Sequence, residues 1–406
     1  MVDAAASLRG TPERREATVA ASRADPSAEI AVSVNTDLAA YAELARRAVF
    51  SPSQSPIWIG NWTRHLGPDF LVATLARGGE TVLSVALEVT RKGPLRTASF
   101  MSGRHANGNM PPVVPEFAAR ASAADIRVLA AAIARTRPDI DLVAFDRLAS
   151  AIGGVANPLL ALPHRPSPNL SLAVDLHGGF DALLSRTSGK RKRKKHRSQT
   201  RKFEKAGGFR RIEAKTEAET NALLDAFFAM KEVRFRKMGI PNVFGEAEVR
   251  SFFRGIFADA LHEPAPSFVL HALEVGGKIR AATGSSRSAE SLICEFGAIA
   301  DDDVAFASPG EFLFFDNIKE ACEQGYAVYD FSVGDEPYKR LWCDIEIVQF
   351  DALLPLSAKG RLLAASMRQV TRLKTFIKNN RLVWKLAKAF RKKAAAHTVQ
   401  AADDSD

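Results

Sequence analysis

The chain has 406 residues, and 46% of its side chains are apolar. A single hydrophobic core usually stops growing near about 250 to 300 residues, so this length predicts two globular units. The cysteines, with no Cys-x-x-Cys pair and no histidine cluster beside them, indicate neither a disulfide framework nor a zinc site, and we expect no metal.

The positive charge is concentrated in two segments. Residues 186–211 contain 13 Lys/Arg and one acid, Glu204, while residues 357–397 contain 12 Lys/Arg and no acid. Because the whole chain has a net charge of +10, the remainder is acidic. This pattern excludes a uniformly basic protein. It predicts an acidic body with two basic segments that face phosphates or another anionic surface.

The amino-terminal segment, residues 1–30, mixes Ala and Ser with charges of both signs and has no apolar core of signal-peptide length. No later stretch reaches the roughly 18 uncharged apolar residues of a membrane span. We therefore expect a disordered leader, a second disordered segment at residues 398–406, and a cytoplasmic protein.

The first half of the chain predicts helices, a strand meander, a helix and further strands. Alternating, β-branched runs on either side of Gly78-Gly79 indicate a hairpin, and the later Ala/Ile/Leu pattern indicates a helix. The expected helices are residues 36–50, 58–66 and 121–136, and the expected strands are residues 70–77, 81–92, 95–101, 141–145 and 171–176.

The second half repeats this order, with Gly276-Gly277 turning the first two strands of its meander. The expected helices are residues 180–206, 216–239, 247–261 and 309–324, and the expected strands are residues 268–275, 278–287, 291–299, 328–331 and 346–354. We predict an α/β (α+β) fold of two tandem units, residues 31–176 and 177–356, each a mixed, mostly antiparallel sheet flanked by helices. Two unrelated α/β domains are the alternative. Residues 357–397 would add a basic helix.

Two neighbouring features of the second unit suggest a ligand site. Ser308 as N-cap, Pro309 at the first helical position and Gly310 predict a clean helix start, whose free N–H groups attract anions. An ordinary capped helix would have the same sequence. After the strand at 328–331, Gly334 can turn the chain and place polar side chains at the rim of the sheet, where α/β proteins bind ligands. These side chains are Asp335, Glu336, Tyr338 and Lys339.

These residues carry a family resemblance. Residues 305–342, with FASPG at 306–310 and GYAVYDFSVGDEPYKRLW at 325–342, are similar to the BioF2-like or CelD-type acetyltransferases of the GCN5-related (GNAT) superfamily. The basic segment 188–207 resembles the arginine-rich helix that opens the second unit in those proteins. The family is related to the FemAB-type aminoacyl transferases, which contain tandem GNAT units. The resemblance implies two GNAT-like units, with the acetyltransferase domain in the second.

The resemblance also implies acetyl-CoA or another acyl-CoA as donor and a sugar, polysaccharide precursor or lipid intermediate as acceptor, in exopolysaccharide or cell-envelope synthesis. The expected donor contacts are Ser308, Gly310 and Glu311. The expected substrate contacts are Asp335, Glu336, Arg191 and Arg197. One departure is the missing Gln/Arg-x-x-Gly-x-Gly/Ala loop. Its equivalent, residues 301–308, carries three acids that would repel a pyrophosphate unless they point away, so an acyl carrier protein or an aminoacyl-tRNA stays open as donor.

Transfer from a thioester needs a base for the nucleophile's proton and an acid for the departing thiolate. Glu295, in the apolar strand 291–299, would have a raised pKa suited to a base, whereas the alternative is a side chain on the solvent face. We assign Tyr338 as the acid and Lys339 as a group that binds a phosphate or polarises a carbonyl. Asp330 is expected to buttress the strand end.

The basic segments allow rival functions. Seven of the eight residues 190–197 are Lys or Arg, a density typical of nucleic-acid binding. Phe203 is the one aromatic residue nearby, which favours instead a surface helix that contacts an anionic substrate or donor. Residues 361–393 combine an apolar stripe with Lys/Arg, a pattern that suits the inner face of an anionic membrane or docking on the protein's own domain. The rivals are a FemAB-like aminoacyl-tRNA-dependent transferase and a non-catalytic adaptor that binds nucleic acid or membrane.

Overall fold

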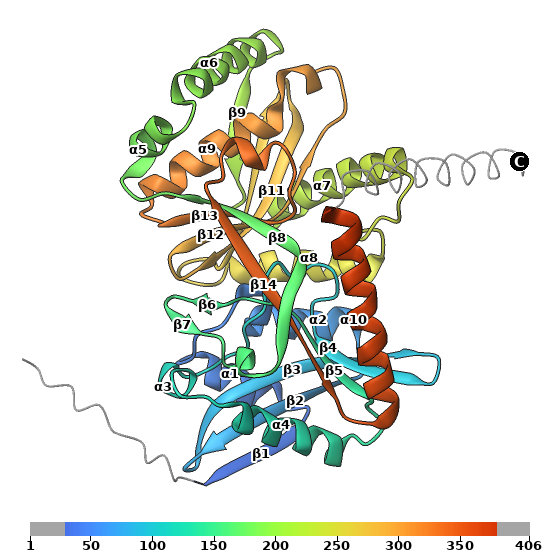
Figure 1. Ribbon diagram of the computed structural model, residues 1–406. Helices are drawn as coiled ribbons and strands as arrows, with labels where there is room; N and C mark the ends of the chain where they lie inside the picture. Colours follow the sequence, from blue (N-terminus) through green and yellow to red (C-terminus); the bar gives the residue numbers. More distant parts are fainter. Residues whose placement is uncertain (1–28, 380–406) are drawn as a thin grey trace, which may run out of the picture.

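The computed structural model describes residues 29–379 (Figure 1). The predicted leader at residues 1–30 falls almost wholly outside this range, and the predicted disordered segment 398–406 and the tail beyond residue 379 fall outside it entirely. Within the described part of the chain, no helix combines the length and the apolar character needed to cross a membrane.

The amino-terminal half largely follows the predicted order of elements. Its helices are α1 (Leu38–Ala45), α2 (Pro56–Leu66), α3 (Pro115–Ala118) and α4 (Ala123–Thr136). Its strands are β1 (Ile30–Asn35), β2 (Phe70–Arg77), β3 (Glu80–Lys92), β4 (Leu95–Phe100), β5 (Leu142–Leu148), β6 (Ala151–Ile152), β7 (Val155–Ala156) and β8 (His164–Asp175). Local chemistry sets the helix starts: Ser55 caps α2, and Ser122 forms a capping box with Asp125 in α4.

The carboxy-terminal half is built in the same way. Its helices are α5 (Gly179–Arg186), α6 (Gly189–Lys205), α7 (Glu217–Met238), α8 (Ala247–Ala260), α9 (Pro309–Glu323) and α10 (Ala358–Asn379). Its strands are β9 (Phe209–Glu213), β10 (Phe268–Val275), β11 (Lys278–Ser288), β12 (Ser291–Ile299), β13 (Val328–Val333) and β14 (Ile345–Pro355). A capping box of Thr216 and Glu219 starts α7, and Gly239 ends it at a left-handed φ of 63°.

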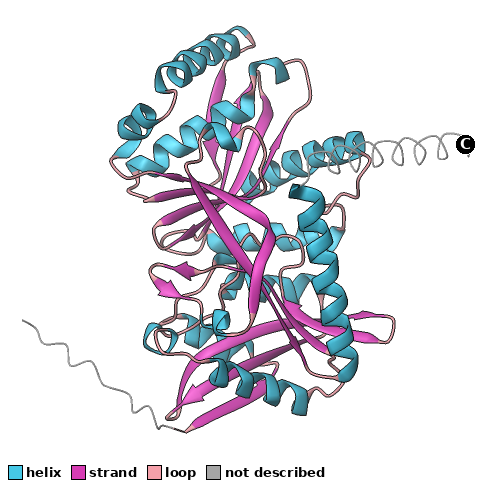
Figure 2. Cartoon of the chain, in the orientation of Figure 1, coloured by secondary structure: helices cyan, strands magenta, loops and turns pink. Residues whose placement is uncertain are grey.

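Twelve strands form one continuous sheet in the order β1-β2-β3-β4-β5-β14-β8-β13-β12-β11-β10-β9, and helices flank it (Figure 2). Neighbouring strands pair antiparallel, except that β4–β5 and β12–β13 pair parallel over three residues each. Each half therefore repeats an antiparallel meander, a helix (α4 or α9) and a parallel strand. The predicted mixed α/β fold with a mostly antiparallel sheet is confirmed.

The two halves exchange strands. β8 is the last strand of the first half but pairs with β13, and β14 is the last strand of the second half but pairs with both β5 and β8. Figure 1 shows these two long strands crossing at the middle of the molecule. Each half thus completes its sheet with a strand from the other, and we keep the division into units 31–176 and 177–356 as a proposal about sequence repeats.

The halves also share a hydrophobic core, which fixes their relative position. Helix α2 of the first half packs on α8 of the second. The ring of Phe252 meets Trp58 edge-on at 4.9 Å and Trp62 edge-on at 5.0 Å, and all three side chains are buried. Aromatic contacts of this geometry stabilise packing beyond their buried area.

The single helix predicted at residues 180–206 is wrong. The chain breaks into α5 and α6 at Thr187, which has extended backbone angles. Gly189 permits the sharp turn because a Cβ at this position would lie 2.3 Å from the carbonyl oxygen of Leu184. Glycine is therefore required by close packing of the two helices at this junction.

Other local differences come from long-range pairing. β1 lies where a leader ending near residue 30 and a helix from residue 36 were expected, and it is ordered by antiparallel pairing with β2. The helix predicted at 36–50 begins only after Asp37, whose side chain caps it, and ends at Ala45. The edge strand β9 was missed. β8 begins at His164 rather than at residue 171, and its start was not predicted because prolines there hide the strand pattern.

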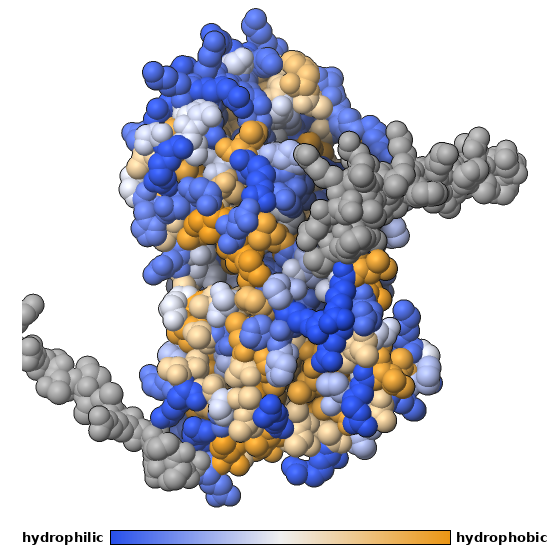
Figure 3. Space-filling model, in the orientation of Figure 1, coloured by the Kyte–Doolittle hydropathy of each residue, from blue (hydrophilic) through white to orange (hydrophobic). Residues whose placement is uncertain are grey.

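Helix α10, the start of the predicted basic tail, packs against β14, β5 and β8. Ala364 is buried, and Gly360 fits because any Cβ would lie 1.7 Å from the carbonyl oxygen of Asp141. The first turns of this helix thus dock on the protein's own sheet. At the opposite end of the molecule, hydrophilic side chains gather over α6 (Figure 3).

Candidate functional site

A cavity of about 670 Å³ opens where β12 and β13 separate. The two strands pair through residues 291–293 and 328–330. Beyond this point residues 294–299 and 331–333 line the cavity. Separated strands offer backbone N–H and C=O groups to a ligand, and the volume lies within the range of small-molecule sites, about 300 to 1,000 Å³.

A β-bulge in β12 sets the direction of Glu295. The register with β11 passes from Cys294 opposite Ser285 to Phe296 opposite Gly284, so Glu295 has no partner residue. Such an extra residue re-aims the local side chains, and Glu295 lines the cavity. Gly284 makes the bulge possible because a Cβ there would lie 2.2 Å from the ring of Phe296.

The carboxyl group of Glu295 is buried and hydrogen-bonded on both oxygens. Ser286 Oγ donates to Oε1 at 2.5 Å, and Asn107 Nδ2 donates to Oε2 at 2.6 Å. Burial raises the pKa of Glu295 to about 7, the two hydrogen bonds oppose this rise, and the carboxylate of Asp330 adds to it. A carboxyl group with this pKa can exchange a proton near neutral pH.

Asn107 reaches Glu295 from the other half of the molecule, on the loop between β4 and α3. Its Nδ2 also donates to the main-chain oxygen of Glu295 at 3.0 Å. Gln349 of β14 donates to the carbonyl of Asn107, and Arg147 of β5 donates to the carbonyl of Ala106. The loop is thus fastened to the central strands and presents Asn107 at a fixed position.

The same loop closes the corresponding gap in the first half. β4 and β5 separate after three residues, as β12 and β13 do, but Asn109 forms a parallel bridge with Leu148 in this gap. The Asn109 N–H donates to Arg147 O at 2.8 Å, and its side chain accepts from Gln54 Nε2 at 3.0 Å. In the first half, a loop of the chain itself therefore occupies the gap between the two parallel strands. In the second half, the corresponding gap is the cavity.

Lys339 is a buried part of the rim. Its Nζ donates to the carbonyl oxygens of Ser332 and Val333, at 3.1 Å each, and pairs with Glu336 at 3.0 Å. Both Lys339 and Glu336 line the cavity. These contacts hold the end of β13 and the turn that follows.

Tyr338 lines the cavity with a half-exposed ring, which stacks on Phe314 at 5.8 Å between centroids. Burial raises the pKa of Tyr338, so its hydroxyl carries its proton at neutral pH. Asp330 accepts hydrogen bonds from Ser171 Oγ (3.1 Å) and Ser332 N (2.6 Å), and burial raises its pKa to about 6. Its bonds connect β13 to β8.

The predicted donor contacts also border the cavity. Ser308, Gly310 and Glu311 line it at the start of α9. Ser308 occupies the N-cap position but has a left-handed φ of 56° and makes no side-chain cap, which corrects the expected capping role. Gln199 of α6 holds this turn by donating to the carbonyls of Ala307 (2.9 Å) and Ser308 (3.1 Å).

The three acids before α9 are all ion-paired. Asp302 and Asp303 pair with the buried guanidinium of Arg280, and Asp301 pairs with Lys237. Two cations thus offset most of the charge of three carboxylates, which reduces the expected repulsion of a phosphate group at this loop.

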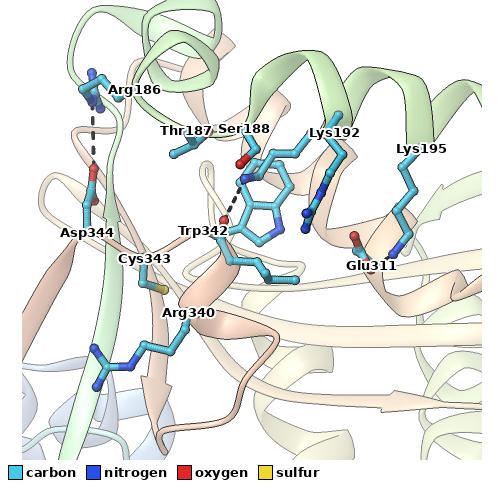
Figure 4. A pocket seen from close by; sticks show the side chains of 12 residues that line it. Arg186, Thr187, Ser188, Lys192, Lys195, Glu311, Arg340, Trp342, Cys343 and Asp344 are labelled. Carbon is cyan, nitrogen blue, oxygen red and sulfur yellow. Dashed lines mark hydrogen bonds and ion pairs between the residues drawn. The ribbon is translucent and has the colours of Figure 1, made fainter.

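A second cavity of about 640 Å³ adjoins the first and shares Glu311 and Trp342 with it (Figure 4). Lys192 lies across the indole of Trp342, with Nζ 4.7 Å from the ring centroid, and Lys195 pairs with Glu311. The cations that line this cavity are Arg186, Arg191, Lys192, Lys195 and Arg340.

The remaining predicted substrate contacts lie elsewhere. Arg197 sits on the exposed part of α6 and lines neither of these two cavities. Asp335 also lies outside both linings and accepts from Arg340 at 2.6 and 3.0 Å. Of the substrate contacts expected from the sequence, Glu336 borders the first cavity and Arg191 the second.

Among the side chains of the first cavity that sequence reasoning missed are Asn107, Lys231 and Arg234. Asn107 lies in a polar loop whose sequence carries no sign of a distant partner. Lys231 interrupts the apolar stripe of α7 one turn after Phe227. A lysine at such a position was the feature of the sequence that could have indicated a site residue.

One group of potential metal ligands occurs in residues 29–379: Glu213, His271 and Glu320. Arg211 donates to Glu320 and to Asn317 in the same place. Burial lowers the pKa of His271 to about 3, helped by the positive charge of Arg211. The guanidinium of Arg211 thus pairs with one of the two carboxylates of this cluster, that of Glu320.

Comparison with known proteins agrees with this geometry. Residues 190–340 match the model of the acetyltransferase (GNAT) domain, and this range includes most of the residues that line the first cavity. No curated protein sequence matches the chain.

Solved structures show the fold. The chain is similar to the crystal structure of FemX, with a TM-score of 0.53, 11% identity, and coverage of 80% of this chain and 97% of that one. Two further structures have lower TM-scores. The C-terminal domain of a putative lysylphosphatidylglycerol synthetase from Agrobacterium fabrum has a TM-score of 0.47 and 12% identity, with coverage of 81% of this chain and 96% of that one. A tandem GNAT protein from the clavulanic acid biosynthesis pathway has a TM-score of 0.45 and 11% identity, with coverage of 81% of this chain and 99% of that one.

Proposed function

We propose that the chain is an acyltransferase that moves an acyl group, acetyl in the simplest case, from acyl-CoA to an amine or hydroxyl of a sugar, a polysaccharide precursor or a lipid intermediate. The observation that carries this proposal is Glu295, a carboxyl group with a pKa of about 7 on the wall of a cavity between separated strands. The acetyltransferase (GNAT) domain at residues 190–340 supports the reaction class.

In the proposed reaction, the carboxylate of Glu295 accepts a proton from the acceptor while its nitrogen or oxygen attacks the thioester carbonyl carbon. The C–N or C–O bond forms, the C–S bond breaks, and the sulfur leaves with the electron pair and takes the proton of Tyr338. Solvent then returns the proton from Glu295 to Tyr338. General acid or base catalysis by one such group typically contributes about 10²- to 10⁴-fold.

Lys339 has a positioning role in this proposal. Its ammonium is bound to two carbonyls of β13 and to Glu336, so it keeps the rim in place beside Tyr338. Because its donors are already used in these contacts, we assign Lys339 no direct contact with a substrate phosphate.

The residues near α9 suit a phosphate-bearing donor. The N–H of Gly310 lies at the start of a fifteen-residue helix, where the helix dipole favours negative charge. The adjoining cavity supplies Arg191 and Lys192. With the carboxylates of residues 301–303 paired to Lys237 and Arg280, acyl-CoA or an acyl carrier group is compatible with this loop.

Transfer from an aminoacyl-tRNA is the second candidate. Six cations of α6 make neither an ion pair nor a cation–π contact with any residue of the described range 29–379: Lys190, Arg191, Lys194, Arg197, Arg201 and Lys205. A row of unpaired cations would neutralise RNA phosphates, and binding would then fall steeply with salt. A non-catalytic adaptor on nucleic acid or on the inner membrane face, through residues 361–393, would have no use for a buried titrating Glu295.

Thiol release from acetyl-CoA with a panel of amino sugars and hexoses tests the proposal. We expect turnover that Glu295→Gln lowers by about 100-fold or more, whereas Glu323→Gln, an exposed acid on α9, leaves the rate unchanged. Equal rates for wild type and Glu295→Gln would reject Glu295 as the base. Salt-sensitive tRNA binding without acyl-CoA binding would favour the second candidate.

A further inference from the structure

Helix α7 brings two cations to the wall of the first cavity, where neither forms an ion pair with a carboxylate of the described residues 29–379. Lys231 and Arg234 lie one turn apart on α7 and both line the cavity. From this we infer that Lys231 and Arg234 form a binding site for an anionic group, a carboxylate or a phosphate, on the acceptor. The inference rests on the proposed function, since it names the class of acceptor at that site.

Lys231 sits in a cage of aromatic rings. Its Nζ lies 5.5 Å from the ring centroid of Phe227, 5.8 Å from that of Phe235 and 5.5 Å from that of Phe244. Such rings attract a cation but leave its N–H donors free for a ligand. Burial lowers the pKa of Lys231 to about 8; the positive charge of Arg234 adds to this effect and the carboxylate of Glu336 opposes it.

Two of the three cations that line the cavity have no ion-pair partner among residues 29–379. All three of its carboxylates already have partners: Glu295 accepts from Ser286 and Asn107, and the other two pair with Lys339 and Lys195. Those two are Glu336 and Glu311. Within residues 29–379, neither Lys231 nor Arg234 has a carboxylate at ion-pair distance. An anionic group on a ligand would therefore supply the missing charge.

The location of Lys231 points to the acceptor as the ligand that carries this group. Phe227 and Phe244, two rings of the cage, pack against Phe296 at 4.3 and 6.0 Å. Phe296 follows Glu295, the proposed base, at the bulge of β12. The phosphates of a donor have a separate anchor at Gly310 and the cations of the adjoining cavity. An acceptor whose amine or hydroxyl lies at Glu295 can therefore place a nearby anionic group of the same molecule at Lys231.

Arg234 completes the site at the cavity mouth. It is more exposed than Lys231, and its positive charge acts on both Lys231 and Tyr338. A planar guanidinium can bind a carboxylate or phosphate through two N–H groups. A rigid lysine deep in the wall and an arginine at the entrance together favour an acceptor with one anionic group near its amine or hydroxyl.

The test compares acceptors that differ only in the anionic group. One pair is glucosamine 6-phosphate and glucosamine, and the other is glycine and glycinamide, each with acetyl-CoA and thiol detection. We expect the anionic member of at least one pair to react with a kcat/KM about 10- to 100-fold higher. The pair that shows the preference distinguishes a phosphate from a carboxylate.

Variants of α7 then assign the effect. Lys231→Met should lower kcat/KM for the anionic acceptor by about 10- to 100-fold and so remove the preference, and Lys231→Arg should restore part of it. Lys237→Met is the matched control, because Lys237 lies on the same helix but pairs with Asp301 outside this cavity. Binding of glucosamine 6-phosphate and glycine, measured by calorimetry on the same variants, gives a readout independent of turnover.

The outcomes separate the inference from the proposed function. A preference for neutral acceptors, or equal losses for both members of a pair in Lys231→Met, would overturn the inference while acyl transfer stands. Anion binding that depends on Lys231, without turnover from any thioester, would support the site and contradict the proposed reaction. Absence of both binding and preference for either anion would reject the anionic acceptor.

Discussion

Asn107 and Glu295 are 188 residues apart in sequence, yet Asn107 Nδ2 lies 2.6 Å from Glu295 Oε2 and 3.0 Å from Glu295 O. One amide thus holds both the carboxylate and the main chain of the bulge. The loop of Asn107 belongs to the half whose own strand gap is closed, and it contacts the half whose gap is open. The first half therefore contributes to the candidate site through this loop.

The rate of acyl transfer should rise with pH through about 7. Glu295 must be ionised to accept a proton, and its pKa in the folded protein is about 7, so the base is mostly protonated below this pH and ionised above it. The measurement is kcat/KM against pH with a hydroxyl acceptor, which has no titration of its own in this range. A flat profile between about pH 5.5 and 8.5 would contradict the assignment of Glu295.

Asn107→Ala should shift that inflection to higher pH. The Asn107 amide donates to the ionised form of Glu295 and lowers its pKa, whereas burial raises it. Removal of the amide should therefore raise the pKa of Glu295 further. We expect a shift of roughly half a unit to one unit and a rate loss of about 10-fold at pH 7. Asn221→Ala, which removes a hydrogen bond that Arg254 of α8 donates to the first turns of α7, should leave the profile in place. A lower rate without a shifted inflection would mean that Asn107 has only a structural role.

Gly284→Ala should destabilise the protein and reduce activity together. The new Cβ would approach the Phe296 ring to 2.2 Å, and overpacking of a core typically costs about 1 to 3 kcal/mol. Displacement of Phe296 would also move the adjacent Glu295. Gly297→Ala is the control for stability, because its Cβ would make ordinary contacts at 3.5 Å or more. Denaturant unfolding of both variants checks the expectation, and equal stabilities would contradict it.

Arg280→Gln should weaken donor binding. The guanidinium pairs with Asp302 and Asp303, and its loss would leave two carboxylates without a countercharge near the start of α9. We expect KM for acetyl-CoA to rise about 10-fold and stability to fall by about 1 to 3 kcal/mol, since Arg280 is buried but Asp303 is exposed.

Lys237→Gln serves as the comparison for this prediction. It breaks the ion pair with Asp301, both members of which are mostly exposed, so stability should change by less than about 1 kcal/mol. If both variants raised KM for acetyl-CoA equally, the buried position of Arg280 would have no special importance for the donor.

Several features of the site were predictable from local sequence. The apolar run around Glu295, the rim from Asp335 to Lys339 and the helix start at Ser308 depend on residues that are neighbours along the chain. Periodicity and turn residues report such features, because they reflect the backbone angles and side-chain faces of a short segment. The basic character of α6 was equally visible.

Other features depend on residues that meet only in three dimensions. The exchange of β8 and β14, the closing of the first strand gap by Asn109, and the contact of Asn107 with Glu295 join segments far apart in sequence. The pKa of Glu295 near 7 follows from its burial. The lack of an ion pair at Lys231 follows from the charged side chains that the fold places around it. The sequence by itself thus determined the order of elements and the candidate base, because hydrophobic periodicity is local. Only the tertiary structure decided which half holds the open site and what surrounds its charges, because strand pairing and desolvation are set by distant parts of the chain.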